Sequence, residues 1–491
     1  MLSEIQQKSG RLSGIRRSTT HFSKDDKLSC GIDGRGTVDN ETLSKKSMSC
    51  HQFAISISFT VDFQESIGYN TIISYFRRMI GGYIVDYIQR DIEKVILEAS
   101  RSYAAILVTG PRQVGKTTML RHITEENRVY VTLDDLEARR TAQTDPELFL
   151  SLYPAPVLID EVQYAPQLFS YIKIAVDRGA APGSFWMTGS QAFRLMELAQ
   201  ESLAGRTAIL QMSSLSQHEV YGSGENTPFE IGIEKLRERA PQGHRTDTKG
   251  MYERIWRGSM PGSVSGKFPN RDTFYSSYLQ SYIQRDIGDM VDRIDTLLFA
   301  DFVRAAACRA GQMLNTHDIA MDVGVTDDTA RRWLKLMEKS GVIFFLRPYS
   351  NNLLKRTIKT PKMYFFDTGL VAYLTKYSSP DILMNGAMNG AILENYTVAE
   401  TMKSYTNAGK ECLLHYYRDK DSKEVDMIIE SDGELHPFEI KKSASPGTEL
   451  ASAFKVLDAG SMPRGMGAIL CMKEELSAID KTTLIVPIWM I

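Results

Sequence analysis

The sequence predicts an α/β protein: a phosphate-binding domain with a parallel sheet, then a helical module, then a smaller α/β domain. Three observations predict this class. The short apolar run 104–109 leads directly into a glycine-rich loop followed by a helical pattern. The apolar run 156–161 ends in two acids. Near the C-terminus, the strand-like runs 424–430 and 435–441 are joined by a polar turn.

The composition is that of a globular protein with about three domains, at about 150 residues per domain for the 491 residues. With 43% hydrophobic and 24% charged residues, the chain is too apolar to be disordered. Its 58 basic and 60 acidic residues give a net charge of −2, which argues against a polybasic protein but not against a local basic patch. No apolar run approaches the roughly 18 residues that span a bilayer. The five cysteines form no CxxC pair, so we expect a cytoplasmic location, no membrane association and no disulfide framework.

The chain divides into four expected regions. Residues 1–78 form a disordered or mis-called N-terminal extension, because the first fifty residues hold nine Ser and five Gly and show no apolar periodicity. A genuine small subdomain is the alternative for this region. We expect the phosphate-binding domain at 79–230, a helical linker with a helix-turn-helix at 231–375, and the C-terminal domain at 376–491.

The loop at 110–118 fits the phosphate-binding pattern G-x-x-x-x-G-K-[ST]. Its glycines let backbone N–H groups surround phosphate oxygens, Lys116 reaches the β- and γ-phosphates, and the Thr117 hydroxyl ligates Mg²⁺. We therefore expect ATP and Mg²⁺ as cofactors and an ATPase activity. The residues expected to contact the nucleotide are Gly110, Pro111, Arg112, Gln113, Val114, Gly115, Lys116, Thr117 and Thr118.

The acidic strand end completes this predicted site. Asp160 would hold Mg²⁺ and Glu161 would polarise the attacking water, because both stand at the carboxyl end of the strand. Two further strands are expected at 129–135 and 184–191. The second ends in hydroxyls and an amide that sense the γ-phosphate or, alternatively, only form a turn.

These motifs resemble the AAA-type P-loop ATPases, in particular a prokaryotic family in which the ATPase precedes a C-terminal domain of unknown function. The resemblance covers most of residues 80–491 and implies nucleotide binding. In AAA proteins an arginine often contacts the γ-phosphate from a neighbouring subunit, so the resemblance makes Arg206 a candidate and implies a homo-oligomer; a surface or intramolecular role is the alternative. The segments that carry the resemblance are Arg90-Asp91, 110–118, Leu158–Gln163, Leu203–Arg206 and Tyr364–Leu370.

A helix-turn-helix is predicted beyond the ATPase. The first helix covers 314–320, Gly324 permits a tight turn, and Thr326 caps a second helix at 327–340. Ala330, Trp333 or Leu334, and Met337 form the inner stripe of the second helix, and Arg331, Arg332, Lys335 and Lys339 fall on its other faces.

A two-stranded wing is expected next, and it is basic. No Asp or Glu occurs from 340 to 366. A basic stripe beside such a helix pair is typical of contact with a phosphate backbone, so DNA is the expected partner through residues 314–362. Winged helices also serve protein contacts, which is the alternative. The cations of the stripe are Arg347, Lys355, Arg356, Lys359 and Lys362.

The C-terminal runs place two acids together. If Asp432-Gly433 forms a two-residue hairpin turn, paired residue numbers sum to 865 and Asp426 lies opposite Glu439. A divalent cation would compensate their repulsion, and Lys441 lies on the same face. The pattern is similar to the PD-(D/E)xK nuclease fold, which implies that Asp426, Glu439 and Lys441 are catalytic, and that Glu394 joins Asp426 and Glu439 as a metal ligand. A plain ion pair between Glu424 and Lys441 in an inactive domain is the alternative.

The leading functional hypothesis is an ATP-dependent molecular switch that acts on DNA through the winged helix. One alternative is a Mg²⁺-dependent DNA endonuclease regulated by its ATPase. The other is a non-catalytic, ATP-gated scaffold that binds protein.

Overall fold

The computed structural model describes residues 87–190, 203, 205–268, 270–288, 294–349, 360–419 and 423–491. The predicted extension at 1–78 lies outside these residues and stays a prediction.

A five-stranded, wholly parallel sheet forms the first described domain, as expected. Alternate side chains of the inner strand at residues 105–109 enter two separate apolar clusters: Ile106 and Val108 face one, and Ala105 and Leu107 face the other. A strand covered on both faces is expected to be continuously apolar, as this one is. The strands are β1 (Ala105–Thr109), β2 (Val129–Thr132), β3 (Val157–Asp160), β4 (Phe185–Gly189) and β5 (Thr207–Gln211), in the order β2-β3-β4-β1-β5.

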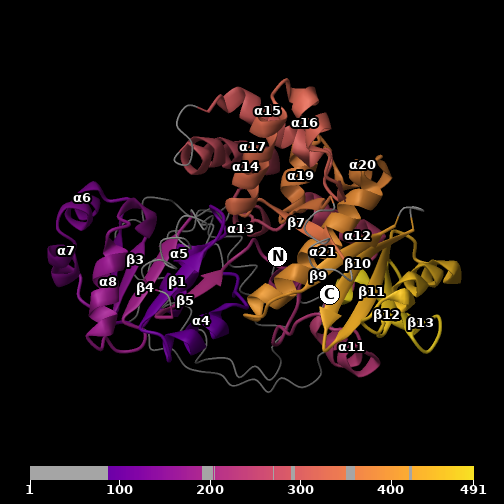
Figure 1. Cartoon of the computed structure of the whole chain (residues 1–491), viewed down its shortest axis with the longest axis horizontal. Helices are drawn as coiled ribbons and strands as arrows, with labels where there is room; N and C mark the ends of the chain where they lie inside the picture. The colour runs from indigo at the N-terminus through magenta and orange to yellow at the C-terminus, as the bar shows by residue number, and fades with distance from the viewer. Residues whose placement is uncertain are drawn as a thin grey trace, which may run out of the picture. The chain divides into compact units, whose positions relative to one another are not determined.

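Helices flank this sheet on both faces (Figure 1). They are α4 (Glu93–Ser100), α5 (Lys116–Ile123), α6 (Leu136–Thr144), α7 (Pro146–Leu152) and α8 (Leu168–Asp177). The strand order has one consequence for the site. Since β4 lies between β1 and β3, the strand that ends at Thr188 and Gly189 separates the glycine-rich loop from the acidic strand end.

The helical module follows β5. Its aromatic stripe is core: Tyr275, Tyr278 and Tyr282 are all buried. The elements are α10 (Gln217–Tyr221), α11 (Ile233–Arg239), α12 (Thr248–Arg257), α13 (Pro261–Val264), α14 (Arg271–Ser281), a π-helical turn at Tyr282–Ile287, α15 (Thr296–Ala307), α16 (Thr316–Val323) and α17 (Asp327–Lys339).

The predicted helix pair is present as α16 and α17, which lie together with α15 (Figure 1). Gly324 adopts a left-handed conformation with φ +78° between them, and Thr326 caps α17 by accepting a hydrogen bond from the Thr329 N–H. Ala330 and Met337 are buried on the inner face, as predicted. Both helix positions and the capping residue therefore follow from local sequence signals.

Strands of the helical module and of the C-terminal region form one nine-stranded sheet, in the order β13-β14-β12-β11-β10-β9-β7-β8-β6. The junction is the parallel pairing of β7 with β9, which aligns Arg347 with His415. The sheet thus crosses residue 375, where the sequence suggested a domain boundary. Its strands are β6 (Gln312–Met313), β7 (Ile343–Pro348), β8 (Lys362–Phe365), β9 (Leu414–Arg418), β10 (Glu424–Ser431), β11 (Glu434–Lys441), β12 (Gly467–Cys471), β13 (Ser477–Ala478) and β14 (Thr483–Pro487).

Three helices lie between β8 and β9: α19 (Thr368–Leu374), α20 (Pro380–Asn385) and α21 (Asn389–Asn407). α21 packs on β8 and β11 and buries several polar side chains, among them Asn395 and Lys403. The Asn395 amide accepts from the Phe365 N–H at 2.8 Å and donates to the Phe365 carbonyl at 2.7 Å. The Lys403 ammonium donates to Glu400 and to the Leu215 carbonyl, each at 2.9 Å. α21 thereby holds β8 and the loop after β5 through polar contacts.

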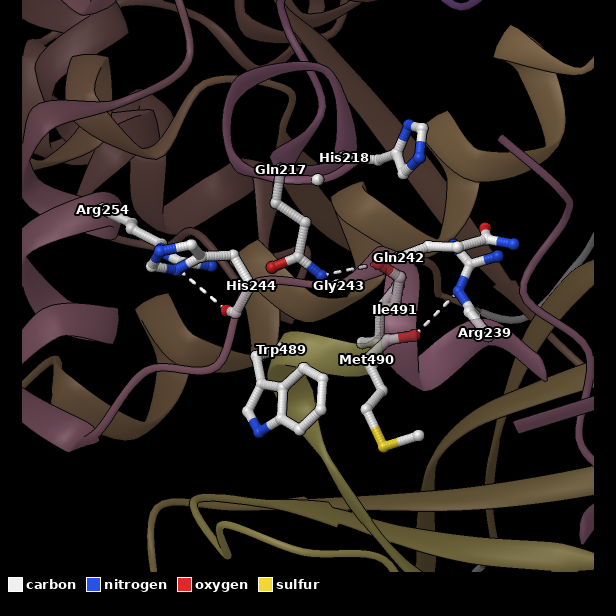
Figure 2. Close-up of a pocket in the computed structure, with 11 residues that line it drawn as sticks. Gln217, His218, Arg239, Gln242, Gly243, His244, Arg254, Trp489, Met490 and Ile491 are labelled. Atoms are coloured by element: carbon white, nitrogen blue, oxygen red, sulfur yellow. Dashed lines mark hydrogen bonds between the residues drawn. The ribbon is translucent and has the colours of Figure 1, made fainter. Parts of the chain in front are cut away.

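The segment 488–491 packs against α10 and α11. Gln217 Nε2 donates to the Ile491 carbonyl at 2.6 Å, and Arg239 Nε donates to the Met490 carbonyl at 2.8 Å (Figure 2). The cavity enclosed there measures about 10 Å³, room for about one water molecule. It is a packing defect, too small to admit an organic ligand.

One hexapeptide, Tyr-Ile-Gln-Arg-Asp-Ile, occurs twice, at 87–92 and at 282–287. The first copy is irregular and ends in a turn before α4, whereas the second is the π-helical turn after α14. Because identical sequences adopt different conformations here, tertiary contacts decide between them.

The contact between α21 and β8 makes a testable prediction. Asn395→Ala leaves both backbone groups of Phe365 without the partners they have in the folded chain, so we expect a loss of about 3 kcal/mol in the free energy of unfolding. Asn385→Ala, at an exposed position of α20, should change it by less than about 0.5 kcal/mol. Denaturant unfolding monitored by circular dichroism measures both. Equal midpoints for the two variants would show that the Asn395 hydrogen bonds do not stabilise the fold.

Candidate functional site

The glycine-rich loop between β1 and α5 has a conformation that its glycines permit. Gly110 has φ +147°, and a Cβ there would lie 2.0 Å from the Met212 carbonyl oxygen. Gly115, at the N-terminus of α5, has φ +96°, and no side chain caps the helix at that position. The first N–H groups of α5 therefore remain available to an anion, which the positive end of the helix favours.

The Lys116 ammonium is buried beneath the loop. Its Nζ donates to the carbonyls of Gly110 and Pro111, both at 2.8 Å. Burial lowers the pKa of Lys116 to about 8, with the acids Glu161 and Asp286 acting in the opposite direction. The loop thus contains a cation held by neutral carbonyls, which is a weaker environment for charge than phosphate oxygens provide.

Asp160, at the end of β3, gathers hydroxyls from three elements. Thr117 and Thr188 each donate to its Oδ1 at 2.8 Å, and the Tyr130 hydroxyl donates to its Oδ2 at 3.2 Å. The structure therefore brings together Thr117 and Asp160, the residue pair predicted to hold Mg²⁺. A carboxylate and a hydroxyl are suitable oxygen ligands for that ion.

Glu161 follows directly and has a left-handed backbone, φ +57°, which is unusual for a residue with a side chain. Gln163 Nε2 donates to Glu161 Oε2 at 2.5 Å and to Ser190 Oγ at 3.4 Å. Backbone strain of this kind is common at functional sites. Sequence reasoning missed Gln163, although it ends the Leu158–Gln163 segment that carried the family resemblance.

Asp286, in the π-helical turn, is a site residue that sequence reasoning also missed. It is 3% exposed, and its Oδ1 accepts from Arg112 Nε of the loop at 3.1 Å. Burial raises the pKa of Asp286, while Arg112 and Lys116 lower it. The helical module therefore supplies an acid to the loop. The repeated hexapeptide is the one signal that pointed to this position.

The first copy of the hexapeptide supplies a cation to the same loop. Arg90 donates to the carbonyls of Val114 at 2.7 Å and Ser213 at 2.9 Å, and it pairs with buried Glu219 at 2.8 Å. Each copy thus contacts the loop with a different charged residue, Arg90 or Asp286. The loop is held from two sides.

The loop also touches the end of α17. Gly341 has φ +73°, and a Cβ there would lie 2.9 Å from Pro111 Cγ. The backbone at Gly341 therefore lies close to Pro111 of the loop. Ser340, directly after α17, shares a hydrogen bond of 2.8 Å with the Tyr282 hydroxyl of the π-helical turn. Two short paths therefore join the glycine-rich loop to α17.

Arg206 lies elsewhere. It precedes β5, which runs parallel to β1, so it stands at the opposite end of the sheet from the loop. Its guanidinium pairs with Asp177 at the end of α8, with an Nε–Oδ1 distance of 2.5 Å. A contact between Arg206 and the nucleotide of a neighbouring subunit stays a prediction.

The predicted C-terminal residues converge. The hairpin register sums to 865 over the paired residues, as predicted, and Asp432 and Gly433 both have positive φ in its turn. Lys441 Nζ lies 2.5 Å from Glu439 and 3.6 Å from Asp426. Asp426 Oδ2 also accepts from the Ile440 N–H at 2.9 Å. Asp426, Glu439 and Lys441 are therefore neighbours, as expected.

Lys362 was expected in an exposed basic stripe, and that expectation is wrong. It is 3% exposed, because β8 carries its side chain into the C-terminal acids. Its Nζ lies 2.8 Å from Glu394, 2.6 Å from Glu424 and 3.9 Å from Asp426. The alternative ion pair between Glu424 and Lys441 is not formed, since Glu424 contacts Lys362 and Arg418 instead.

Two acids of this cluster are largely withdrawn from water. Burial raises the pKa of Glu394 to about 7, with Asp426 adding to the effect, and it raises the pKa of Glu439 to about 7 for the same two reasons. Glu394 Oε1 accepts from Lys362 at 2.8 Å and from the Tyr364 hydroxyl at 2.6 Å, and its role as a metal ligand stays a prediction. Among the described residues, no group of three His, Cys, Asp or Glu has an arrangement suited to a metal ion.

The cations predicted on the outer faces of α17 are not buried: Arg331, Arg332 and Lys335 are exposed, and Lys339 is half-buried. Arg331 pairs with Asp328 at 2.8 Å. Arg347 of β7 is also exposed. The wing cations Lys355, Arg356 and Lys359 lie outside the described residues.

Membrane-spanning helices are absent from the described part of the chain, where no helix is both long enough and apolar enough to cross a bilayer.

Three families match separate parts of the chain. Residues 102–221 match a family described as an AAA domain. Residues 248–381 and 389–491 match two families, each described as a domain of unknown function (DUF8612 and DUF4143). The AAA match spans the parallel sheet and its glycine-rich loop, in agreement with an α/β P-loop fold.

Relatives with similar sequences are uncharacterized. The proteins Mb2031c of Mycobacterium bovis and Rv2008c of Mycobacterium tuberculosis are each 28% identical over 376 residues, covering 75% of this chain and 77% of theirs. Two solved structures are more distant. The Walker-type ATPase PABY2304 of Pyrococcus abyssi is 14% identical, with a TM-score of 0.36 over 58% of this chain and 94% of its own. A single-substitution variant of RuvB from Thermotoga maritima is 13% identical, with a TM-score of 0.25 over 52% of this chain and 88% of its own.

The lowered pKa of Lys116 makes a prediction about proton uptake. At pH 8.5 a lysine with a pKa of about 8 is mostly neutral, whereas phosphate oxygens favour the ammonium form. ATP binding at that pH should take up about three quarters of a proton per nucleotide at Lys116, and binding should weaken as pH rises from 7 to 9. Calorimetry in buffers of different ionisation enthalpy measures the uptake.

Lys116→Arg is the control for this prediction, because a guanidinium stays charged throughout the range. Any nucleotide binding that it retains should proceed without the uptake. Equal proton uptake in both proteins would assign the titration to another group.

Proposed function

We propose that this protein is an ATP-hydrolysing switch that acts on double-stranded DNA through α16 and α17. The observation that carries the proposal is the contact between the glycine-rich loop and the end of α17, where Gly341 meets Pro111. A nucleotide that changes the loop also changes the surface on which α17 ends. Nucleotide state and DNA contact are then coupled through packed atoms rather than through a flexible linker.

The residues of the loop fit a nucleoside triphosphate with its magnesium ion. The N–H groups of the loop and of α5 would hold the phosphates together with Lys116, whose present partners are only carbonyls. Thr117 and Asp160, already in contact at 2.8 Å, would hold Mg²⁺, which supplies charge stabilisation for phosphoryl transfer. Glu161 would orient and deprotonate the attacking water, and Gln163 fixes its carboxylate.

The DNA-binding part of the proposal rests on α17 and its neighbours. α15, α16 and α17 together with β6, β7 and β8 have the element order of a winged helix. Such folds place the second helix of the turn in the major groove. Arg332 and Lys335 extend from the outer face of α17, and Arg347 from β7. These three side chains would contact phosphates.

The π-helical turn provides the second link between loop and helix. Asp286 holds Arg112 of the loop, and Tyr282 of the same turn bonds Ser340 at the end of α17. π-Helical turns are frequent at functional sites. A change in the loop that releases Arg112 would therefore reach α17 through one turn of helix.

ATP turnover tests the catalytic residues. Glu161→Gln should keep ATP binding but lower kcat by about 100-fold or more, because the carboxylate that accepts the proton is lost. Lys116→Ala should abolish turnover together with tight ATP binding. A phosphate-release assay with a parallel nucleotide-binding measurement checks both, and full turnover in the Glu161 variant would place the base elsewhere.

DNA affinity tests the helix-turn-helix. Replacing Arg332 and Lys335 by alanine should weaken binding to duplex DNA and reduce the slope of log affinity against log salt by about 2, since each phosphate contact contributes about 1. Arg237→Ala removes one exposed cation of α11, outside the helix-turn-helix, and should leave both quantities unchanged. Fluorescence anisotropy at several salt concentrations measures them. Absence of binding at low salt would instead favour the protein-scaffold hypothesis.

A separate experiment tests the coupling between nucleotide state and DNA affinity. Wild-type affinity for DNA should differ between the protein with a non-hydrolysable ATP analogue and the protein with ADP. Tyr282→Phe removes the hydroxyl that bonds Ser340, so it should reduce that difference while leaving ATP turnover intact. Tyr278→Phe, the same change one turn earlier, is the control and should preserve the difference. Equal coupling in wild type and both variants would exclude this path.

A further inference from the structure

The Lys362 ammonium occupies the centre of the C-terminal acid cluster. It reaches Glu424 at 2.6 Å and Glu394 at 2.8 Å, and it lies over the Tyr416 ring at 5.4 Å from the centroid. Lys362 belongs to β8, on the helical-module side of the nine-stranded sheet, whereas Glu424 begins β10. The Lys362 ammonium of β8 thus neutralises Glu424 of β10 and Glu394 of α21.

The charges of the cluster explain why a cation is needed there. Four carboxylates approach one another, and two ammonium groups and one guanidinium compensate them. Burying a carboxylate without a partner costs several kcal/mol, so the acids cannot be left uncompensated. The acids are Glu394, Glu424, Asp426 and Glu439, and the cations are Lys362, Lys441 and Arg418.

The nuclease resemblance implies a divalent metal at these acids, and the residues present do not fit one. Mg²⁺ needs carboxylate oxygens at about 2.1 Å and a nearly complete octahedron of oxygen ligands. Glu394 and Glu424 instead surround an ammonium at hydrogen-bond distance, and a dication placed between them would repel it. Only Glu439 keeps an oxygen, Oε2, that is buried and has no hydrogen-bond partner.

We propose that Lys362 is the resident cation of this cluster, taking the place of the divalent metal that the resemblance to the nuclease fold implies. Two consequences follow. The wild-type chain binds no divalent cation at Asp426 and Glu439, and removal of the Lys362 ammonium creates a divalent-cation site there. The cluster then serves to hold β8 to the C-terminal strands, and phosphodiester hydrolysis at this site is not a property of the wild-type chain.

This inference does not depend on the proposed ATP-driven switch, because it concerns residues outside the glycine-rich loop. Mn²⁺ is a suitable probe, since it accepts carboxylate ligands and its binding is measured by electron paramagnetic resonance or calorimetry. Measurements use the full chain without nucleotide, which keeps Mn²⁺ from being recruited as a metal–nucleotide complex.

The main comparison is between wild type and Lys362→Met, which keeps the length of the side chain but removes the charge. Lys362→Met should bind Mn²⁺ at least about tenfold more tightly than the wild type, because buried carboxylates lose their cation. Adding Asp426→Asn to Lys362→Met should remove the gain. Lys423→Met removes one positive charge from an exposed neighbour of the cluster and should behave as wild type.

Two results of the Mn²⁺ measurements would overturn the inference. One is wild-type Mn²⁺ binding that Asp426→Asn or Glu439→Gln abolishes, since the wild-type cluster would then hold a metal beside Lys362. The other is a folded Lys362→Met protein with no gain in affinity.

Folding is followed by thermal unfolding with and without Mn²⁺, and stabilisation of Lys362→Met alone supports the inference. If Lys362→Met does not fold, Mn²⁺ binding by the wild type and by Lys362→Arg still tests the inference. Lys362→Arg keeps a cation, so it should bind no Mn²⁺ at Asp426 and Glu439. Cleavage of plasmid DNA by wild type, abolished by Asp426→Asn, would also refute it. Loss of ATP-dependent DNA binding would affect the proposed function only.

Discussion

A charge removed from water must keep a partner, and the junctions of this protein depend on that constraint. Arg90 ties the segment before α4 to the glycine-rich loop, and Arg112 ties the loop to Asp286 of the helical module. Lys403 ties α21 to the loop after β5, and Lys362 ties β8 to the C-terminal acids. Each cation would cost several kcal/mol if its partners moved away. Apolar packing builds the individual layers, whereas buried cations fix how adjacent elements meet.

Several of these buried charged contacts meet at the glycine-rich loop. Lys116 differs from these four cations, because its hydrogen-bond partners in the described structure are only neutral carbonyls, and burial lowers its pKa. An anionic ligand would give it the opposite charge that it lacks. Around it, Arg90 and Asp286 contact the loop from two sides. A ligand that redistributes charge here acts on contacts that extend to Tyr282 and the end of α17.

Local signals predicted much of this structure. The glycine spacing, the Asp432-Gly433 turn and the Thr326 cap each act within a few residues, and the structure has all three as expected. Long-range contacts were beyond such reasoning. Nothing near Lys362 in the sequence indicates that its first acidic partner, Glu394, lies 32 residues later, so its positive charge suggested a surface role. The hexapeptide at 87–92 and 282–287 shows the limit most directly, because one local sequence has two conformations.

The sheet shared by the helical module and the C-terminal region has a consequence for dissecting the chain. β7 and β9 are partners along their backbones, so a cut between residues 348 and 414 that separates them exposes one hydrogen-bonding edge on each fragment. Exposed edges are templates for intermolecular pairing. Fragments made at the junction of the two matched families of unknown function, near residue 385, would therefore tend to aggregate. The two matched families therefore divide the strands of one continuous sheet between them.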